Sequence, residues 1–329
     1  MKKILFLIPE GLKEGQPSYE RIYSFVEFYK QQNVKTQIYI IQNKFMDNIR
    51  LILFIYRNSI KNIFISMPPF RNWFLFFLLG IRIIFDIRDG WSIAIKTGYG
   101  GLVKPNKIKA SLCKFIEKTA IKRSYITITC TLGLQEYLKK ISQKNVLLIT
   151  NGSSQKDIEI IETLRTLEKK KTDSSTNIAV CVGKFSEYGR DKVKLIFHKI
   201  NKLEKKTVIK LIGSDINSNS WISEWLLDNG MCNIEIDFLH RMDRRNIFIE
   251  VINADFGLSV IRDPSYDYGT KVFDYINCSI PMFNYFEEEN YFTVFFKGFF
   301  YGDNKILLKK SFIREQIINE YKEFLIVLK

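Results

Sequence analysis

Residues that can bind a phosphate and a ribose gather in one stretch of the chain, Asp263–Pro281. An apolar run ends near Val260, a loop containing Pro and Gly follows, and we expect a helix with Lys271 and Asp274 in its first turns. Backbone N–H groups at such a helix start can bind an anion. A carboxylate one turn into the helix can accept hydrogen bonds from a ribose diol. The alternative is a loop with a solvated helix face, because acidic residues are common at helix starts.

Basic residues follow a second apolar run, Ile178–Val182. Gly183 would let the backbone approach a diphosphate closely, because glycine has no side chain. Arg190 can hold phosphate oxygens through two hydrogen bonds, and Lys184 and Lys192 can act as point charges. Such cations would stabilise the charge that builds on a departing diphosphate. A solvated basic face is an equally good interpretation of any one of them.

Two carboxylates and a guanidinium stand at the end of a third apolar run, Ile81–Ile87. Asp86 and Asp89 can bind an acceptor hydroxyl or assist its deprotonation. The alternative is that they pair with Arg88 or cap the next segment.

Short β-branched runs alternate with helical segments throughout, which predicts parallel βαβ units in doubly wound sheets. The expected strands are Lys3–Ile8, Val34–Ile41, Asn62–Ser66, Ile81–Ile87, Tyr125–Cys130, Val146–Ile149, Ile178–Val182, Val208–Ile212, Ile234–Leu239 and Phe256–Val260. The expected helices are Tyr19–Gln31, Phe45–Ser59, Trp73–Leu79, Lys107–Lys122, Leu132–Ile141, Lys192–Leu203, Trp221–Leu227, Arg244–Ile252 and Lys271–Asn277.

A charged and polar segment, Ser153–Thr176, interrupts this alternation and predicts a surface helix followed by a linker at Lys169–Thr176. We therefore expect two similar domains, residues 1–170 and 171–310. Residues 311–329 would form a C-terminal helix that packs back on the first domain.

The motif Lys271-Val-Phe-Asp274-Tyr275, followed by Ile280-Pro281, resembles the K-x-F-E-Y…G-x-P signature of glycosyltransferase family 4 and its GT-B relatives. In that family the carboxylate of the motif holds the ribose of a nucleotide-sugar donor. Asp274 stands where Glu is usual, and Ser279 where Gly is usual. A second family Glu lies eight positions earlier, where this chain has Tyr266 beside Asp267.

Further segments resemble family motifs in the same order. They are Asp86-Ile-Arg88-Asp89-Gly-Trp91, Asn151-Gly152, Val182-Gly183-Lys184 with Arg190 and Lys192, and Leu211-Ile212-Gly213. The resemblance implies a GT-B fold of two doubly wound Rossmann-like domains facing across a cleft. It also implies transfer of a hexose from a nucleoside diphosphate sugar to a glycan or lipid-linked acceptor, with retention, and without metal or cofactor.

The candidate residues fall into three groups. The catalytic candidates are Asp89, Arg190 and Lys192; the donor-binding candidates are Gly15, Gly183, Lys184, Tyr266, Asp267, Gly269, Thr270, Lys271 and Asp274; the acceptor-side candidates are Asp86 and Arg88. Gly15 belongs to the loop after the first expected strand, which in this fold borders substrate phosphates.

The chain has 50 Lys and Arg against 35 Asp and Glu, a net charge of +15, which attracts polyanions. Its aromatic and basic patches at Phe70–Leu79 and at Phe295–Tyr301 with Lys309-Lys310 predict contact with an anionic membrane surface, although a core helix is the alternative for Phe70–Leu79. The apolar stretch Trp73–Gly80 is too short to span a bilayer. We expect a cytoplasmic protein, peripheral at the inner face of the membrane.

Cysteine and histidine are too sparse for a disulfide framework or a multi-histidine metal site, at five and two residues. No helix-turn-helix, zinc-finger or RNP-type motif is present, so no nucleic-acid partner is expected. Two rival functions remain: a nucleotide-sugar epimerase or phosphorylase-like enzyme of the same fold, and a non-enzymatic basic protein that binds polyanions.

Overall fold

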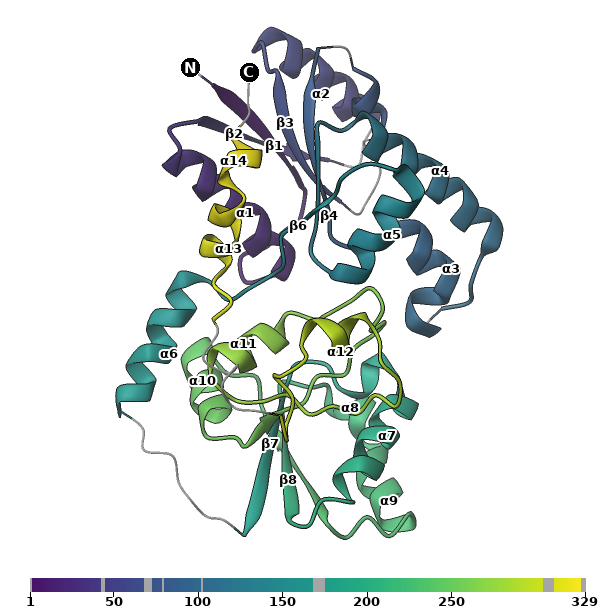
Figure 1. The fold of residues 1–329 in the computed structure, drawn as a ribbon, viewed down its shortest axis with the longest axis vertical. Coiled ribbons are helices and arrows are strands. Elements are labelled where there is room, and N and C mark those ends of the chain that lie inside the picture. Colours follow the sequence, from purple (N-terminus) through teal and green to yellow (C-terminus); the bar gives the residue numbers. More distant parts are fainter. Residues whose placement is uncertain are drawn as a thin grey trace. The chain divides into compact units, whose positions relative to one another are not determined.

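A computed structural model describes residues 2–42, 45–67, 73–78, 80–101, 103–167, 175–303 and 311–326 of the chain. It divides into two compact units, each built around its own parallel sheet (Figure 1). Unit 1 comprises Met1–Asn151 and Arg314–Lys329, and unit 2 comprises Gly152–Ile313. The boundary falls after Asn151, whereas the sequence placed it at residue 170. The expected linker lies largely outside the described residues.

Unit 1 contains, within its described residues, six parallel strands in the order β2-β1-β3-β4-β5-β6. The strands are β1 (Lys3–Pro9), β2 (Lys35–Ile41), β3 (Asn62–Met67), β4 (Arg82–Ile87), β5 (Ile126–Thr129) and β6 (Leu147–Leu148). The helices are α1 (Pro17–Gln31), α2 (Phe45–Arg57), the 3-10 turn η1 (Trp73–Phe77), α3 (Trp91–Gly101), α4 (Lys107–Arg123), α5 (Leu132–Ser142), α13 (Arg314–Glu320) and α14 (Lys322–Leu325). β1 pairs with β2 on one side and β3 on the other, so the strand order reverses there.

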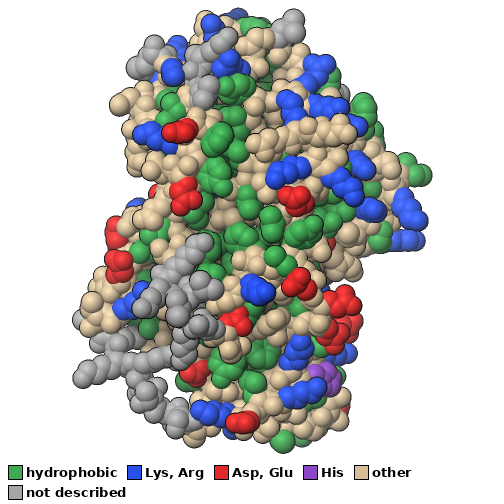
Figure 2. Space-filling model, in the orientation of Figure 1, with side chains coloured by type: hydrophobic (Ala, Val, Ile, Leu, Met, Phe, Trp, Pro, Cys, Tyr) green, Lys and Arg blue, Asp and Glu red, His purple; other side chains and the backbone are tan. Residues whose placement is uncertain are grey.

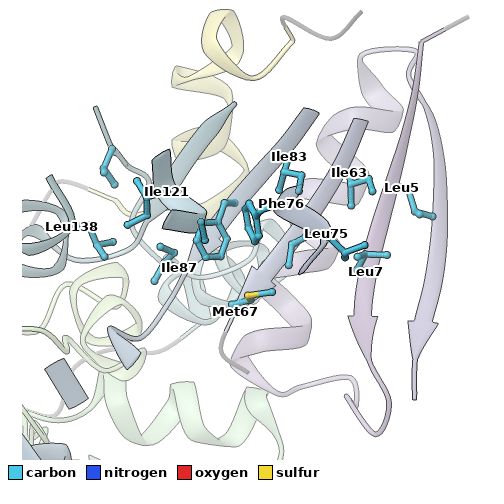
Figure 3. Close-up of a cluster of buried hydrophobic side chains, with 14 of the residues drawn as sticks. Leu5, Leu7, Ile63, Met67, Leu75, Phe76, Ile83, Ile87, Ile121 and Leu138 are labelled. Carbon is cyan, nitrogen blue, oxygen red and sulfur yellow. The ribbon is translucent and has the colours of Figure 1, made fainter. Parts of the chain in front are cut away.

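Apolar side chains along the strands of unit 1 pack into two separate cores, one on each face of the sheet, because neighbouring side chains on a strand point to opposite faces. Leu5 and Leu7 face a core that includes side chains of α2, η1, α4 and α5 (Figure 3). Phe6 faces the other core, which α1, α13 and α14 cover. In that second core the Tyr29 hydroxyl of α1 donates a hydrogen bond to the Leu325 carbonyl, at 3.0 Å. The C-terminal segment is therefore part of unit 1.

Unit 2 has, in the part that is described, parallel strands in the order β10-β7-β8-β9. Isolated parallel bridges extend this sheet from Gly257 to Met282 and from Met282 to Phe300. The strands are β7 (Thr176–Val182), β8 (Lys206–Ile212), β9 (Ile234–Leu239) and β10 (Phe256–Gly257). The helices are α6 (Gln155–Leu167), the 3-10 turn η2 (Ser186–Tyr188), α7 (Arg190–Ile200), α8 (Ile216–Asn219), α9 (Trp221–Asp228), α10 (Arg244–Ile252), α11 (Lys271–Asn277) and α12 (Tyr291–Phe295).

Helix α3 was not expected from the sequence. Its last residues include Gly98, Gly100 and Gly101, and glycine disfavours helices. Tertiary contacts outweigh that preference: Ile95 of α3 packs with Ala110 and Cys113 of α4. The expected helix at Trp73–Leu79 is a shorter 3-10 turn, Trp73–Phe77.

The side chain of Tyr275, on α11, holds together the carboxyl ends of β7 and β10. Its hydroxyl accepts a hydrogen bond from the Val182 backbone N–H at 3.1 Å and donates one to the Leu258 carbonyl at 3.0 Å. The ring lies so close to Gly257 that an added Cβ there would be 2.4 Å from it. Only glycine therefore fits at position 257 while the tyrosine ring is in place.

We expect Gly257→Ala to lower the free energy of unfolding by about 1–3 kcal/mol, because the new methyl group overpacks the Tyr275 ring. In a Tyr275→Ala background the same substitution should cost far less, since the ring is gone. Urea unfolding of the two single variants and the double variant measures the coupling. An equal cost in both backgrounds would show that the ring does not restrict position 257.

Candidate functional site

The strand order of unit 2 reverses between β7 and β10, and ligands of doubly wound sheets bind outside the carboxyl ends of strands at such a point. Gly183 directly follows β7 and has a φ of 92°, which favours glycine. No atom beyond its chain neighbours lies within 4 Å of where its Cβ would be, so this strand end is open. The Gly183 N–H donates to the Ile212 carbonyl at 2.9 Å, and the Gly183 carbonyl accepts from the Ser214 hydroxyl. Close approach of a diphosphate to the open side of this glycine stays a prediction.

Two of the predicted cations are exposed just after this strand end. The Lys184 ammonium lies 5.5 Å from the centre of the Tyr188 ring, and the Arg190 guanidinium 5.3 Å from the centre of the Trp221 ring. Arg190 is also the first residue of α7, and the preceding Gly189 has no side chain with which to cap the helix. The arrangement combines exposed positive charge with helix N–H groups, both of which favour an anion.

Lys192 is committed to a different task from the one expected. Its ammonium group donates hydrogen bonds to the carbonyl oxygens of Ile261, at 3.0 Å, and Arg262. Burial lowers the pKa of Lys192, although Asp263 and Asp267 act in the opposite direction. Lys192 thus fastens α7 to the loop that follows β10, and its ammonium group is already engaged with two carbonyl oxygens.

The loop before α11 organises itself through its own polar groups. Asp267 accepts a hydrogen bond from the Gly269 N–H at 3.0 Å, and its other oxygen is 3.6 Å from Nε of Arg262. Gly269 has a φ of 67°, a backbone conformation that this turn requires and that glycine adopts without strain. Tyr266 is half-buried, and burial raises its pKa. Thr270 precedes α11, and among the described residues its side chain makes no capping hydrogen bond to that helix.

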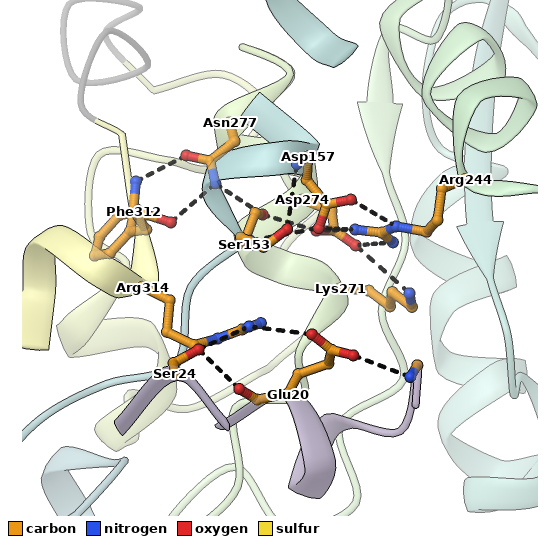
Figure 4. Close-up of polar contacts among 12 residues, drawn as sticks. Glu20, Ser24, Ser153, Asp157, Arg244, Lys271, Asp274, Asn277, Phe312 and Arg314 are labelled. Carbon is orange, nitrogen blue, oxygen red and sulfur yellow. Dashed lines mark hydrogen bonds and ion pairs between the residues drawn. The ribbon is translucent and has the colours of Figure 1, made fainter. Parts of the chain in front are cut away.

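Asp274 was expected to offer its carboxylate to a ribose, on a partly exposed helix. It is instead only 6% exposed, and both of its oxygens are occupied (Figure 4). Arg244 donates to them at 2.9 and 3.2 Å, Ser153 donates at 2.8 Å, and the Lys271 ammonium lies at 3.5 Å. Burial disfavours the ionised carboxyl, but Arg244 and Lys271 outweigh it and lower the pKa of Asp274. In this structure Asp274 is the centre of a buried polar cluster.

Sequence reasoning missed the partners of this carboxylate. Arg244, on α10, also donates to Asp157 at 2.7 and 3.1 Å, and its pKa is raised because the two carboxylates outweigh the effect of burial. Asn277, one turn after Asp274, donates to Ser153 and exchanges two hydrogen bonds with the Phe312 backbone. Apart from Asn277, these residues are distant from Asp274 in the sequence, so no local spacing could have indicated the cluster.

In unit 1, Asp86 is completely buried, so the expected contact with an acceptor is wrong for this structure. Arg21 of α1 donates to its carboxylate at 2.8 and 3.1 Å, and Ser66 donates at 2.8 Å. Arg21 also donates to the Asn151 side chain at 3.1 Å. Burial disfavours charge on the Arg21 guanidinium, but Asp86 outweighs it and raises its pKa. Asp86 therefore positions α1 against the sheet.

Asp89 and Arg88 follow β4 and are partly exposed, at the carboxyl end of the sheet. Arg88 donates to the Ser18 hydroxyl near the start of α1, and its backbone N–H donates to the Met67 carbonyl at 3.0 Å. Gly15 lies in the exposed loop before α1, with a φ of 82° and its N–H donating to Glu20 at 2.9 Å. Asp89 stays a catalytic candidate, Arg88 an acceptor-side candidate and Gly15 a donor-binding candidate.

A buried carboxylate that sequence reasoning did not single out, Glu117 of α4, holds the start of α3. It accepts the Trp91 backbone N–H at 2.6 Å and the Ser92 hydroxyl, which also lies 2.7 Å from the Tyr137 hydroxyl. Burial raises the pKa of Glu117 to about 7, against the effect of these hydrogen bonds. Through Trp91, Glu117 fixes the segment that carries Asp89.

No helix among the described residues is long and apolar enough to cross a membrane. The described residues also contain no group of three His, Cys, Asp or Glu side chains that could hold a metal ion. All five cysteines are free thiols, and Cys232 is the exposed one.

No family model matches the sequence, and no curated protein matches it. Solved structures do resemble the fold. HepE from Anabaena in complex with UDP is 13% identical with a TM-score of 0.59, covering 98% of this chain and 90% of that one. Sucrose-phosphate synthase from Thermosynechococcus elongatus is 13% identical with a TM-score of 0.58, covering 86% and 81%. UDP-GlcNAc 2-epimerase from Methanocaldococcus jannaschii is 11% identical with a TM-score of 0.54, covering 98% and 99%. The expected GT-B fold is confirmed.

We expect Asp274→Ala to lower the free energy of unfolding by about 2–3 kcal/mol, less than for a fully buried pair because Arg244 is partly solvated. Lys271→Ala removes only the most distant partner, which is partly exposed and 3.5 Å away, and should cost about 0.5 kcal/mol or less. Chemical denaturation of both variants checks the difference. Similar losses for the two would mean that the Asp274 carboxylate is not the centre of this cluster.

Glu117 should make the stability of the protein depend on pH. The pKa of Glu117 is about 7 in the folded protein and 4.5 in the unfolded chain. As the pH rises from 4.5 to 7, the carboxyl ionises in the unfolded chain first, so the free energy of unfolding falls over this range. The fall amounts to about 3 kcal/mol and levels off above pH 7. We expect Glu117→Gln to remove it, as seen by urea unfolding from pH 4.5 to 8. The Cys113 thiol, whose pKa burial raises, does not titrate in this range. The same pH dependence in wild type and variant would contradict this assignment.

Proposed function

We propose that this chain is a glycosyltransferase that moves a hexose from a nucleoside diphosphate sugar to a glycan or lipid-linked acceptor. The observation that carries the proposal is the pair of exposed cations, Lys184 and Arg190, beside the open strand end at Gly183. The GT-B fold supports it, since solved structures of this fold include HepE with UDP and with UDP-glucose. We place this reaction in bacterial surface polysaccharide synthesis. We also propose that the configuration at the anomeric carbon of the sugar is retained.

The donor diphosphate would bind against the Gly183 backbone and the first turn of α7. Negative charge builds on the diphosphate as its bond to the sugar breaks, so cations that are already in place stabilise the transition state more than the ground state. Arg190 suits this because its planar guanidinium can hold two phosphate oxygens. Lys192, Asp267 and Gly269 would contribute by keeping the neighbouring loop in shape, and Tyr266 and Thr270 would border the donor.

The acceptor would bind at the carboxyl end of the unit 1 sheet. Asp89 would accept a hydrogen bond from the attacking hydroxyl or remove its proton. The Arg21–Asp86 pair and Glu117 would act on Asp89 indirectly, by fixing α1 and the start of α3. No metal or cofactor is invoked in this scheme, because helix N–H groups and basic side chains supply the positive charge. The enzyme would work at the cytoplasmic face of an anionic membrane.

A second candidate function is nucleotide-sugar epimerisation, because a UDP-GlcNAc 2-epimerase has the same fold over 98% of this chain. An epimerase converts the nucleotide sugar without any acceptor, whereas a transferase releases free nucleoside diphosphate only as an acceptor is consumed. Product analysis with the donor alone distinguishes the two reactions.

We expect Arg190→Ala and Lys184→Ala each to weaken binding of a nucleoside diphosphate about 10- to 150-fold. This corresponds to the ~1.5–3 kcal/mol of a charge-assisted hydrogen bond. Calorimetry with UDP, the nucleotide bound by HepE, is the first measurement. Lys194→Ala is the matched control, because Lys194 lies on the same helix and pairs with the exposed Asp191. Affinities equal to wild type for both variants, across UDP, GDP and ADP, would refute the donor site.

A further inference from the structure

Helix α4 carries large apolar side chains that point away from the interior of unit 1. Ile108, Leu112 and Phe115 are 87%, 61% and 68% exposed. Their spacing of four and three residues places them in one row along the helix. The packed side of α4 is different: small residues such as Ala110, Cys113 and Ala120 are buried there. The row therefore contributes nothing to the core of unit 1.

Positive charge surrounds this row. Helix α4 contains six basic residues, Lys107, Lys109, Lys114, Lys118, Lys122 and Arg123, and all are exposed. Its single acidic residue, Glu117, is buried and engaged with α3. Figure 2 shows Lys and Arg side chains gathered, with hydrophobic ones among them, over the region where Figure 1 draws α4. The α4 face, meaning Ile108, Leu112 and Phe115 with these six cations, has no exposed acidic residue of its own helix.

A surface that combines exposed apolar side chains with positive charge, which no exposed acidic residue of its own helix offsets, matches the interface of an anionic bilayer. There the apolar row can enter the boundary between head groups and acyl chains, while the long basic side chains reach the anionic head groups. The helix of 17 residues would be about 25 Å long and would lie along the membrane plane.

We propose that the α4 face is the membrane-docking surface of this protein. The proposal rests on the membrane association included in the proposed function and assigns it to particular residues. The sequence had placed this contact at Phe70–Leu79 and Phe295–Tyr301 instead. Phe295 packs against the Tyr268 ring and Phe296 against the Phe273 ring, and Phe296 is fully buried. Residues 70–72 and 79, and the Lys309-Lys310 pair of the second predicted patch, lie outside the described part of the chain.

The test is cosedimentation of the full chain with vesicles of phosphatidylglycerol and phosphatidylcholine, compared with phosphatidylcholine alone. The triple variant Ile108→Ser, Leu112→Ser, Phe115→Ser should lose binding at least about tenfold, because each side chain loses its transfer into the apolar boundary. Lys109→Gln with Lys118→Gln should lose about fivefold per charge on anionic vesicles only. Salt should weaken wild-type binding, as the screening length shortens from ~10 Å at 0.1 M to ~3 Å at 1 M.

The matched control is Ile216→Ser with Leu227→Ser, which removes apolar side chains of unit 2 that are 55% and 82% exposed. We expect this variant to bind vesicles as wild type does. UDP binding without vesicles should be unchanged in all these variants, so failure of the docking surface is distinguished from failure of the donor site. Equal vesicle binding by wild type and the α4 triple variant would overturn the proposal. The proposal would also be overturned if light scattering showed that the wild type is a dimer that does not bind vesicles, and that the triple variant is a monomer.

Discussion

The buried carboxylate of Asp274 is the constraint on which unit 2 depends. A charged group that is buried loses its favourable hydration free energy. Opposite charges and hydrogen bonds must replace that loss for the folded state to be stable. Arg244, Ser153 and Lys271 supply that compensation from α10, from the segment before α6 and from α11 itself. The three segments are thereby fixed relative to the sheet. The first turn of α11 and the loop before it owe their position to this cluster.

Unit 1 compensates its buried carboxylate across a helix and a strand, whereas in unit 2 Asp274 and Arg244 both lie on helices. There the carboxylate of Asp86 comes from the sheet and the guanidinium of Arg21 from a helix, and both are buried. The network reaches Asn151, the last residue of the first segment of unit 1. In both units the acidic residue that the sequence assigned to substrate is used to hold elements together. The candidates left at least partly accessible are Lys184 and Arg190 in unit 2 and, separately, Asp89 in unit 1.

Hydrophobic periodicity in the sequence was enough to predict the strands, most helices and the two doubly wound sheets, since it depends on local burial. Partners separated by 65 to 130 residues, as in the Arg21–Asp86 and Arg21–Asn151 contacts, leave no such local signal. Helix α3 was not predicted, because packing on α4 and the buried Glu117 decide its structure rather than local helix preference. The role of Lys192 was missed because its partners are backbone carbonyls, which every residue has.

The packing of Tyr29 against Leu325 has a consequence for synthesis on the ribosome. This contact joins residues 296 positions apart, whereas unit 2 is one uninterrupted stretch between the two segments of unit 1. Domains generally fold as units while the chain emerges. Unit 2 can therefore finish folding before unit 1, whose second core stays open on the α1 side until residues 314–326 have been made. Protease protection of stalled nascent chains should appear for unit 2 first, and protection of unit 1 first would contradict this order.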